Sequence, residues 1–138
     1  MSNEIAVQNS SLTDINETQS MCSFTVETVE DKKKLFKVAT APDHNVAEYI
    51  GKSIKIKDVY AEVVHMTNQE TGEVTDGIRM VIIDDKGESY QCVSSGMWNA
   101  FTRMRAIFGN PTYDPAISIE IKQIDKGVNK KILSFDII

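Results

Sequence analysis

The run SIKIKDVYAEVVHM (residues 53–66) alternates apolar and polar side chains, but the alternation shifts by one residue partway along. Isoleucines alternate with lysines before Asp58. Beyond Asp58 the apolar positions are one residue out of step with those before it: Val59, Ala61 and Val63. A one-residue shift in a period-two pattern is what a β-bulge produces, and a bulged, bent strand can serve both halves of a small closed barrel. The run therefore predicts a long bulged strand that turns Tyr60 away from the core.

The segments after this strand have the order expected of a small barrel. They comprise two strands joined by a turn at Asp85-Lys86-Gly87, a helix capped by Ser94 or Ser95, and two further strands. Their expected bounds are 78–84 and 88–94 for the first pair, 96–108 for the helix, and 116–124 and 130–138 for the second pair. The order predicts a mainly β fold, a five-stranded OB-fold-like barrel with its helix between strands 3 and 4. The alternative is an α+β sheet with a packed helix.

An N-terminal strand and helix are expected to extend this barrel. Residues 1–20 are rich in Asn, Ser, Thr, Gln and Glu, so we expect a mobile arm there and a single domain over 21–138. The string SFTVETV (residues 23–29) alternates as a strand does, and EDKKKLFKVATAP (residues 30–42) favours a helix that ends before its proline. Residues 67–77 are dense in turn formers and predict a long mobile loop.

Composition places the chain among proteins of the cytoplasm. Its 138 residues suffice for one core, and they include no apolar run long enough to cross a membrane and no export signal. The two cysteines, Cys22 and Cys92, are about seventy positions apart, and no metal-ligand spacing surrounds them. We expect two reduced thiols in a cytoplasmic protein that makes no contact with membrane.

The motifs that would indicate an enzyme are missing from the sequence. Gly51-Lys52-Ser53 lacks the upstream glycine of a phosphate-binding loop, and Ser94-Ser95-Gly96 is not a nucleophile elbow. His44 and His65 are about twenty positions apart, and no Glu stands at the spacing that would complete a zinc site. We therefore expect no catalysis, no cofactor, no metal and no small-molecule substrate.

A set of basic and aromatic side chains on the expected strands favours a different function. Its members are Lys52, Lys55, Lys57, Tyr60, His65, Arg79 and Tyr90. Proteins that bind single-stranded DNA use aromatic planes to stack bases and cations to follow the phosphates. The net charge of −5 opposes this reading, but only a locally positive groove is needed. The alternative for each tyrosine is that it covers half-buried strand surface, and Trp98 suits the core side of the helix.

Four strings carry a resemblance to a known family: LFKVATAP, IGKSIKIKDVYAEVV, GIRMVIIDDKGESYQCVSSGM and ISIEIKQIDKGVNKKILSF. Over residues 24–138 the chain resembles the small single-stranded-DNA-binding proteins of phages and mobile elements of Gram-positive bacteria. The resemblance implies an OB fold and sequence-independent, clustered coating of single strands during replication or recombination, with self-association on the DNA. It also implies that Tyr60 and Tyr90 occupy the positions of strand aromatics in such proteins.

A second function stays open at this point. The same barrel could present Tyr60 and the 67–77 loop to another protein, as an interaction module would. The net negative charge favours that alternative.

Overall fold

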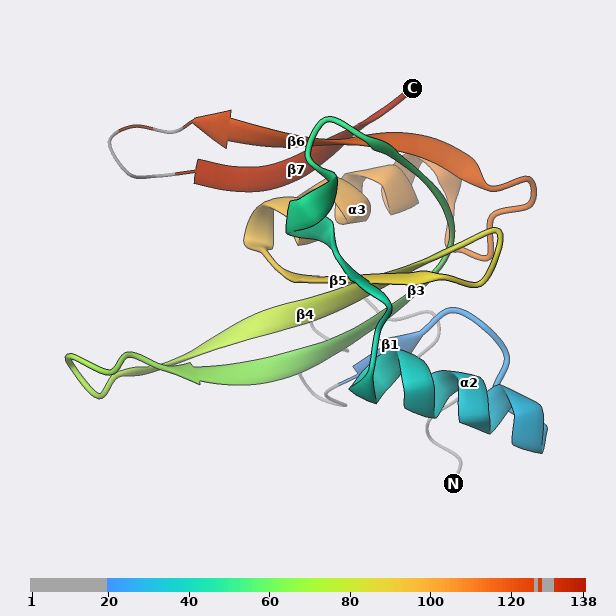
Figure 1. Cartoon of the computed structure of the whole chain (residues 1–138), viewed down its shortest axis with the longest axis horizontal. Coiled ribbons are helices and arrows are strands. Elements are labelled where there is room, and N and C mark those ends of the chain that lie inside the picture. Colours follow the sequence, from blue (N-terminus) through green and yellow to red (C-terminus); the bar gives the residue numbers. More distant parts are fainter. Residues whose placement is uncertain (1–19, 126, 128–130) are drawn as a thin grey trace.

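The computed structural model of the protein describes residues 20–125, 127 and 131–138 (Figure 1). Seven strands in this part form one sheet: β1 (Ser20–Cys22), β2 (His44–Asn45), β3 (Ser53–Thr67), β4 (Val74–Asp84), β5 (Ser89–Val93), β6 (Ile117–Asp125) and β7 (Lys131–Ile137). The helices are α2 (Val29–Thr40), the 3₁₀ helix η2 (Val46–Tyr49) and α3 (Ser95–Phe108). The strand order is β2-β5-β4-β3-β6-β7, and β1 pairs with β3. Within the described part, neither α helix is long and apolar enough to cross a membrane.

Strand β3 is the bent strand that both halves of the sheet share, as its sequence predicts. Residues 53–56 pair with β6, and residues 56–67 pair with β4. The register of the β4 pairing shifts between Ile56 and Asp58, which confirms the bulge expected from the change in alternation. The sheet can therefore curl around one core instead of lying flat.

The bulge residue Asp58 is held by partners from two other segments. Its carboxylate, only 3% exposed, accepts hydrogen bonds from the hydroxyls of Ser23 (2.9 Å) and Thr112. Ser23 Oγ in turn accepts from the backbone N–H of Val59 at 2.9 Å. Asp58 thus ties the segment after β1 and the segment after α3 to the bend of the shared strand.

The fold is mainly β with a curled mixed sheet, which is consistent with an OB-like barrel. It differs in detail from the expected fold, because the sheet has seven strands and because β5 and β7 are not paired with each other over their described residues. Helix α3 lies between them (Figure 1). Ser94 Oγ lies 3.4 Å from the carbonyl oxygen of Leu133 in β7, and a Cβ built on Gly96 would lie 2.2 Å from that oxygen. Only glycine at position 96 permits this contact between α3 and β7.

Helix α3 begins and ends as its sequence predicts. Ser94 is the N-cap, and its hydroxyl accepts from the N–H of Met97, while Gly109 terminates the helix with φ at 90°. The side chains that α3 buries in the main core are Met97, Trp98, Phe101 and Met104. Trp98 is therefore a core residue, whereas Phe108, the last residue of the helix, is 48% exposed.

Helix α2 covers the outer face of β3 and β4 and creates a second apolar cluster. Its N-terminus has a capping box between Thr28 and Asp31, and it ends before Pro42. The buried members of the cluster are Phe24, Val38, Tyr60, Val81 and Ile83. The middle of β4 is consequently buried on both faces, since Met80 and Ile82 belong to the main core.

Two expected boundaries are wrong, and a third prediction falls almost entirely outside the described part of the chain. Residues 23–29 are not a strand, because the alternating Phe24 packs beneath α2 while the strand pairing belongs to β1. The 67–77 loop is shorter than expected, since β3 and β4 stay paired as far as Thr67 and Val74 and only residues 68–73 connect them. The mobile arm predicted for residues 1–20 falls on residues 1–19, which lie outside the described part, and on Ser20, which begins β1.

Candidate nucleic-acid interface

Three of the predicted cations gather on the first half of β3 and the turn before it. Lys52 and Lys55 are exposed, and Lys57 is half-buried beside the bulge. Lys55 points outward because it alternates with Ile54 and Ile56, which are buried in the core. Within the described part of the chain, no carboxylate forms an ion pair with any of these three lysines. Their charges are therefore available to phosphate groups.

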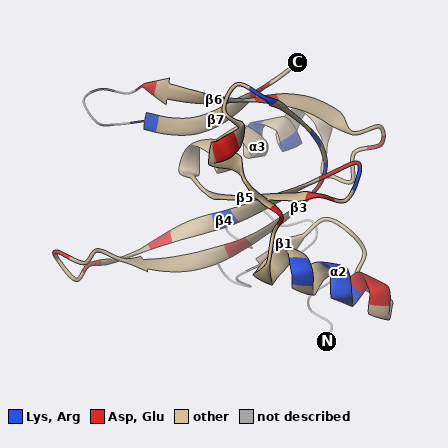
Figure 2. Ribbon diagram, viewed as in Figure 1, with Lys and Arg blue, Asp and Glu red and all other residues tan. Residues whose placement is uncertain are grey.

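The other two predicted cations are already engaged. Arg79 lies 3.2 Å from the carboxylate of Glu62 and donates to the side chain of Gln91 at 3.0 Å. His65 Nδ1 lies 2.6 Å from a carboxylate oxygen of Asp76 in the exposed part of the β3–β4 hairpin. Both residues belong to the second half of β3 and its partner strand, whereas the three lysines belong to the first half of β3 and the turn before it. Figure 2 shows acidic residues along the outer part of this hairpin.

Tyr60 lies on the strand face that the alternation predicts, but the expectation that its ring is exposed is wrong. The side chain is 7% exposed because α2 and Phe24 cover it. Its hydroxyl donates to Glu62 at 2.7 Å, and burial together with this carboxylate raises the pKa of the phenol. In this arrangement a base cannot stack on the ring of Tyr60. Any other role for this residue in DNA binding stays a prediction.

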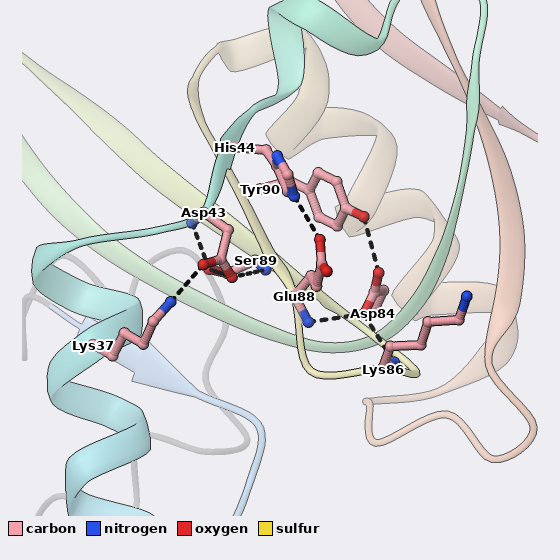
Figure 3. Close-up of polar contacts among 8 residues, drawn as sticks. All are labelled: Lys37, Asp43, His44, Asp84, Lys86, Glu88, Ser89 and Tyr90. Atoms are coloured by element: carbon pink, nitrogen blue, oxygen red, sulfur yellow. Dashed lines mark hydrogen bonds and ion pairs between the residues drawn. The ribbon is translucent and has the colours of Figure 1, made fainter.

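Tyr90 is likewise covered, contrary to the expectation of a strand aromatic open to DNA. It is 7% exposed within the main core, and its ring stacks on that of His44 with centroids 4.9 Å apart (Figure 3). Its hydroxyl donates to the Asp84 carboxylate at 2.9 Å, and burial, followed by this bond, raises the pKa of the phenol. The other oxygen of Asp84 accepts from the N–H groups of Lys86 and Glu88 and closes the turn, as expected for a turn aspartate.

Sequence reasoning missed an aromatic group beside Lys52. His44, Tyr49 and Tyr90 contact one another, with the Tyr49 and Tyr90 centroids 5.0 Å apart. Tyr49 is half-buried, and the Lys52 ammonium lies 5.5 Å from its ring centroid. His44 Nε2 also lies 2.6 Å from a carboxylate oxygen of Glu88 (Figure 3). The run NVAEYIGK (residues 45–52) suits either a helical turn or a linker, and no motif in it indicates this aromatic group.

A second set of contacts in Figure 3 connects α2 to β5. Lys37, near the end of α2, donates to Asp43 at 2.6 Å, and Asp43 accepts from both the N–H and the hydroxyl of Ser89 in β5. The bond from Lys37 holds the pKa of Asp43 below its usual range. These contacts order the helix without adding a reactive group.

The family model for phage single-stranded DNA-binding proteins matches residues 14–138. The chain belongs to this family. The match covers every strand and helix described above, and it confirms the resemblance carried by the four sequence strings. No curated protein and no solved structure matches the chain.

Family membership assigns single-stranded DNA as the partner of this phage single-stranded DNA-binding protein. The family consists of binding proteins and is not generally enzymatic. Among the described residues, no three His, Cys, Asp or Glu side chains lie together in a way that could hold a metal ion. The chemistry available at the lysine-bearing half of β3 is electrostatic attraction of phosphate, with Tyr49 beside Lys52.

Proposed function

We propose that this protein coats phage single-stranded DNA without preference for base sequence, during replication or recombination of the phage genome in the cytoplasm of the host cell. The family match over residues 14–138 is the observation that carries this proposal. Copies of the protein associate with one another along the strand, as clustered coating requires. Because the contacts are to phosphate and to the faces of unpaired bases, single strands are preferred over duplex.

Within this function, we assign the phosphate contacts to Lys52, Lys55 and Lys57. A protein cation that neutralises a phosphate releases counterions from the DNA, and it does so without a competing cost only where it is not already paired with a carboxylate. These three lysines meet that condition, whereas Arg79 and His65 have carboxylate partners. The DNA path thus starts from the first half of β3 and passes Tyr49, the half-buried aromatic beside Lys52.

The test is a titration of fluorescently labelled oligo-dT followed by anisotropy at several salt concentrations. The double variant Lys55→Ala, Lys57→Ala should bind more weakly, and the slope of log affinity against log salt should fall by about 0.7 for each lost contact. Lys122→Ala is the matched control, because Lys122 is a strand lysine that already pairs with Asp136 at 2.7 Å. It should bind as the native protein does.

Each result has a clear meaning. An unchanged slope in the double variant would place the phosphates elsewhere on the protein. Equal affinity for duplex and single strands of one length would reduce the interaction to simple charge attraction. No binding of oligo-dT even at low salt would remove the proposed function and favour the protein-interaction module.

A further inference from the structure

A cavity of about 580 Å³ lies where the β3–β4 hairpin meets the start of α3. Its apolar walls are Met66 from β3, Ile78 from β4, Val93 from β5 and Trp98 from α3. Met66 and Val93 are 43% and 49% exposed, which is high for large apolar side chains on strands. The cavity has the size usual for small-molecule sites, and two of its apolar walls, Met66 and Val93, are open to solvent.

Polar groups accompany these walls. Asp76, Ser95 and Asn99 line the same cavity, so a ligand edge would meet hydrogen-bond acceptors and donors. Trp98 contributes a further feature, because its ring is 3% exposed and its indole N–H has no hydrogen-bond partner within the described part of the chain. A buried donor without a partner is unfavourable, and a ligand acceptor close to Trp98 would relieve it.

The position of the cavity relates it to the sheet face that OB-like proteins use. Bases bind such folds on the face formed by the second and third barrel strands, here β4 and β5. Helix α2 covers this face at Val81 and Ile83. Val93 pairs with Arg79 at the other end of the same two strands. Neither residue belongs to the apolar cluster that α2 covers. The cavity therefore adjoins the open end of the face.

The side chains that line the cavity favour a nucleobase over a phosphate group. The carboxylate of Asp76, although paired with His65, lies in the wall and disfavours an anion. A nucleobase has an apolar planar face for Met66 and Val93 and a polar edge for Asp76 and Asn99. A base paired in a duplex could not present that edge, so only an unpaired base fits.

We propose that this cavity takes one unstacked base of the bound single strand, with Trp98 in its wall. The inference rests on the proposed function, since the base reaches the cavity as part of a strand held elsewhere by lysines. It also assigns a binding role to the second half of β3, which pairs with β4 and carries few cations that lack a carboxylate partner.

Trp98 makes the proposal directly testable, because it is the only tryptophan in the chain. Emission excited selectively from tryptophan reports on the cavity wall, while anisotropy of labelled oligo-dT reports on binding as a whole. We expect oligo-dT to change the Trp98 emission at the concentrations at which anisotropy rises. The variant Asn99→Leu, at an exposed helix position lining the cavity, should lose at least fivefold in affinity, the smallest effect usual for one stacked base.

Ala106→Leu is the matched control, since Ala106 is an exposed position of α3 outside the cavity. It should bind as the native protein does. If Asn99→Leu does not fold by circular dichroism, Met66→Ala on the exposed hairpin replaces it, with a loss of affinity again expected. Normal anisotropy with unchanged Trp98 emission, or with undiminished affinity in the cavity variant, would overturn the base site and leave the proposed function intact. Failure of oligo-dT to bind at all would instead remove the proposed function.

Discussion

Replacement of Tyr60 by alanine separates the two readings of the long strand most sharply. If the ring were exposed for stacking, Tyr60→Ala would weaken DNA binding by about 1–3 kcal/mol and leave the melting temperature nearly unchanged. The structure predicts the opposite: a large fall in the melting temperature and little direct effect on DNA binding. Tyr60 is 7% exposed and packs among Phe24, Val38, Val81 and Ile83.

The magnitude follows from these contacts. Truncation of a buried aromatic residue to alanine costs about 3–5 kcal/mol of unfolding free energy, from lost burial and from the cavity left behind. For a chain of this length, that loss lowers the melting temperature by about 10–20 °C. Tyr60→Phe keeps the ring and removes only the hydrogen bond to Glu62, at a cost of about 1 kcal/mol.

The assay measures thermal unfolding by circular dichroism and oligo-dT affinity on the same three proteins, native, Tyr60→Ala and Tyr60→Phe. We expect affinity, measured below the melting transition of each protein, to change little in Tyr60→Phe. A Tyr60→Ala protein that melts within about 2 °C of the native one, far less than the loss of a buried ring requires, and yet loses DNA binding would refute the reasoning. It would show that α2 does not cover Tyr60 in solution.

Two further predictions concern the contacts of Asp58 and Asp43, which hold neighbouring segments against the sheet. Asp58→Ala leaves the hydroxyls of Ser23 and Thr112 without their acceptor at the bulge, so chemical denaturation should show a loss of about 1–3 kcal/mol, while an unchanged midpoint would contradict the role given to Asp58. The pKa of Asp43 is depressed by Lys37, so its stabilising contribution is complete above the unfolded pKa of about 4 and disappears as the pH falls through the lower folded value. Melting temperatures measured from about pH 6 to pH 2.5 should therefore fall less steeply in Asp43→Asn than in the native protein, and parallel curves would exclude this contribution.

The parts of the fold that depend on local pattern were predictable from the sequence. The bulge at Asp58 follows from the shift in alternation, and the start of α3 follows from Ser94 and the apolar spacing behind it. These features are fixed by the alternation of strand side chains and by the chemistry of helix caps, which act over a few residues. The family resemblance was also carried by local strings and is confirmed.

The parts of the fold that depend on contacts between distant segments were not predictable from the sequence. Nothing near Tyr60 shows that a helix about twenty residues earlier lies over it, because the alternation distinguishes the two faces of a strand but does not tell whether the outer one is covered. Phe24 misled in the same way, since its alternation reflects packing under α2 and not strand pairing. His44 and Tyr90 are 46 positions apart in the sequence, and they meet because β2 pairs with β5 in parallel. No local pattern in the sequence indicates that pairing.

The contact at Gly96 has a mechanical consequence. Between β5 and β7 the curled sheet is connected by the packing of α3 against the Leu133 carbonyl, and over the described residues no ladder of hydrogen bonds crosses there. Ser94 contacts the Leu133 carbonyl and also lines the cavity, so a shift of α3 relative to β7 would change the width of the cavity.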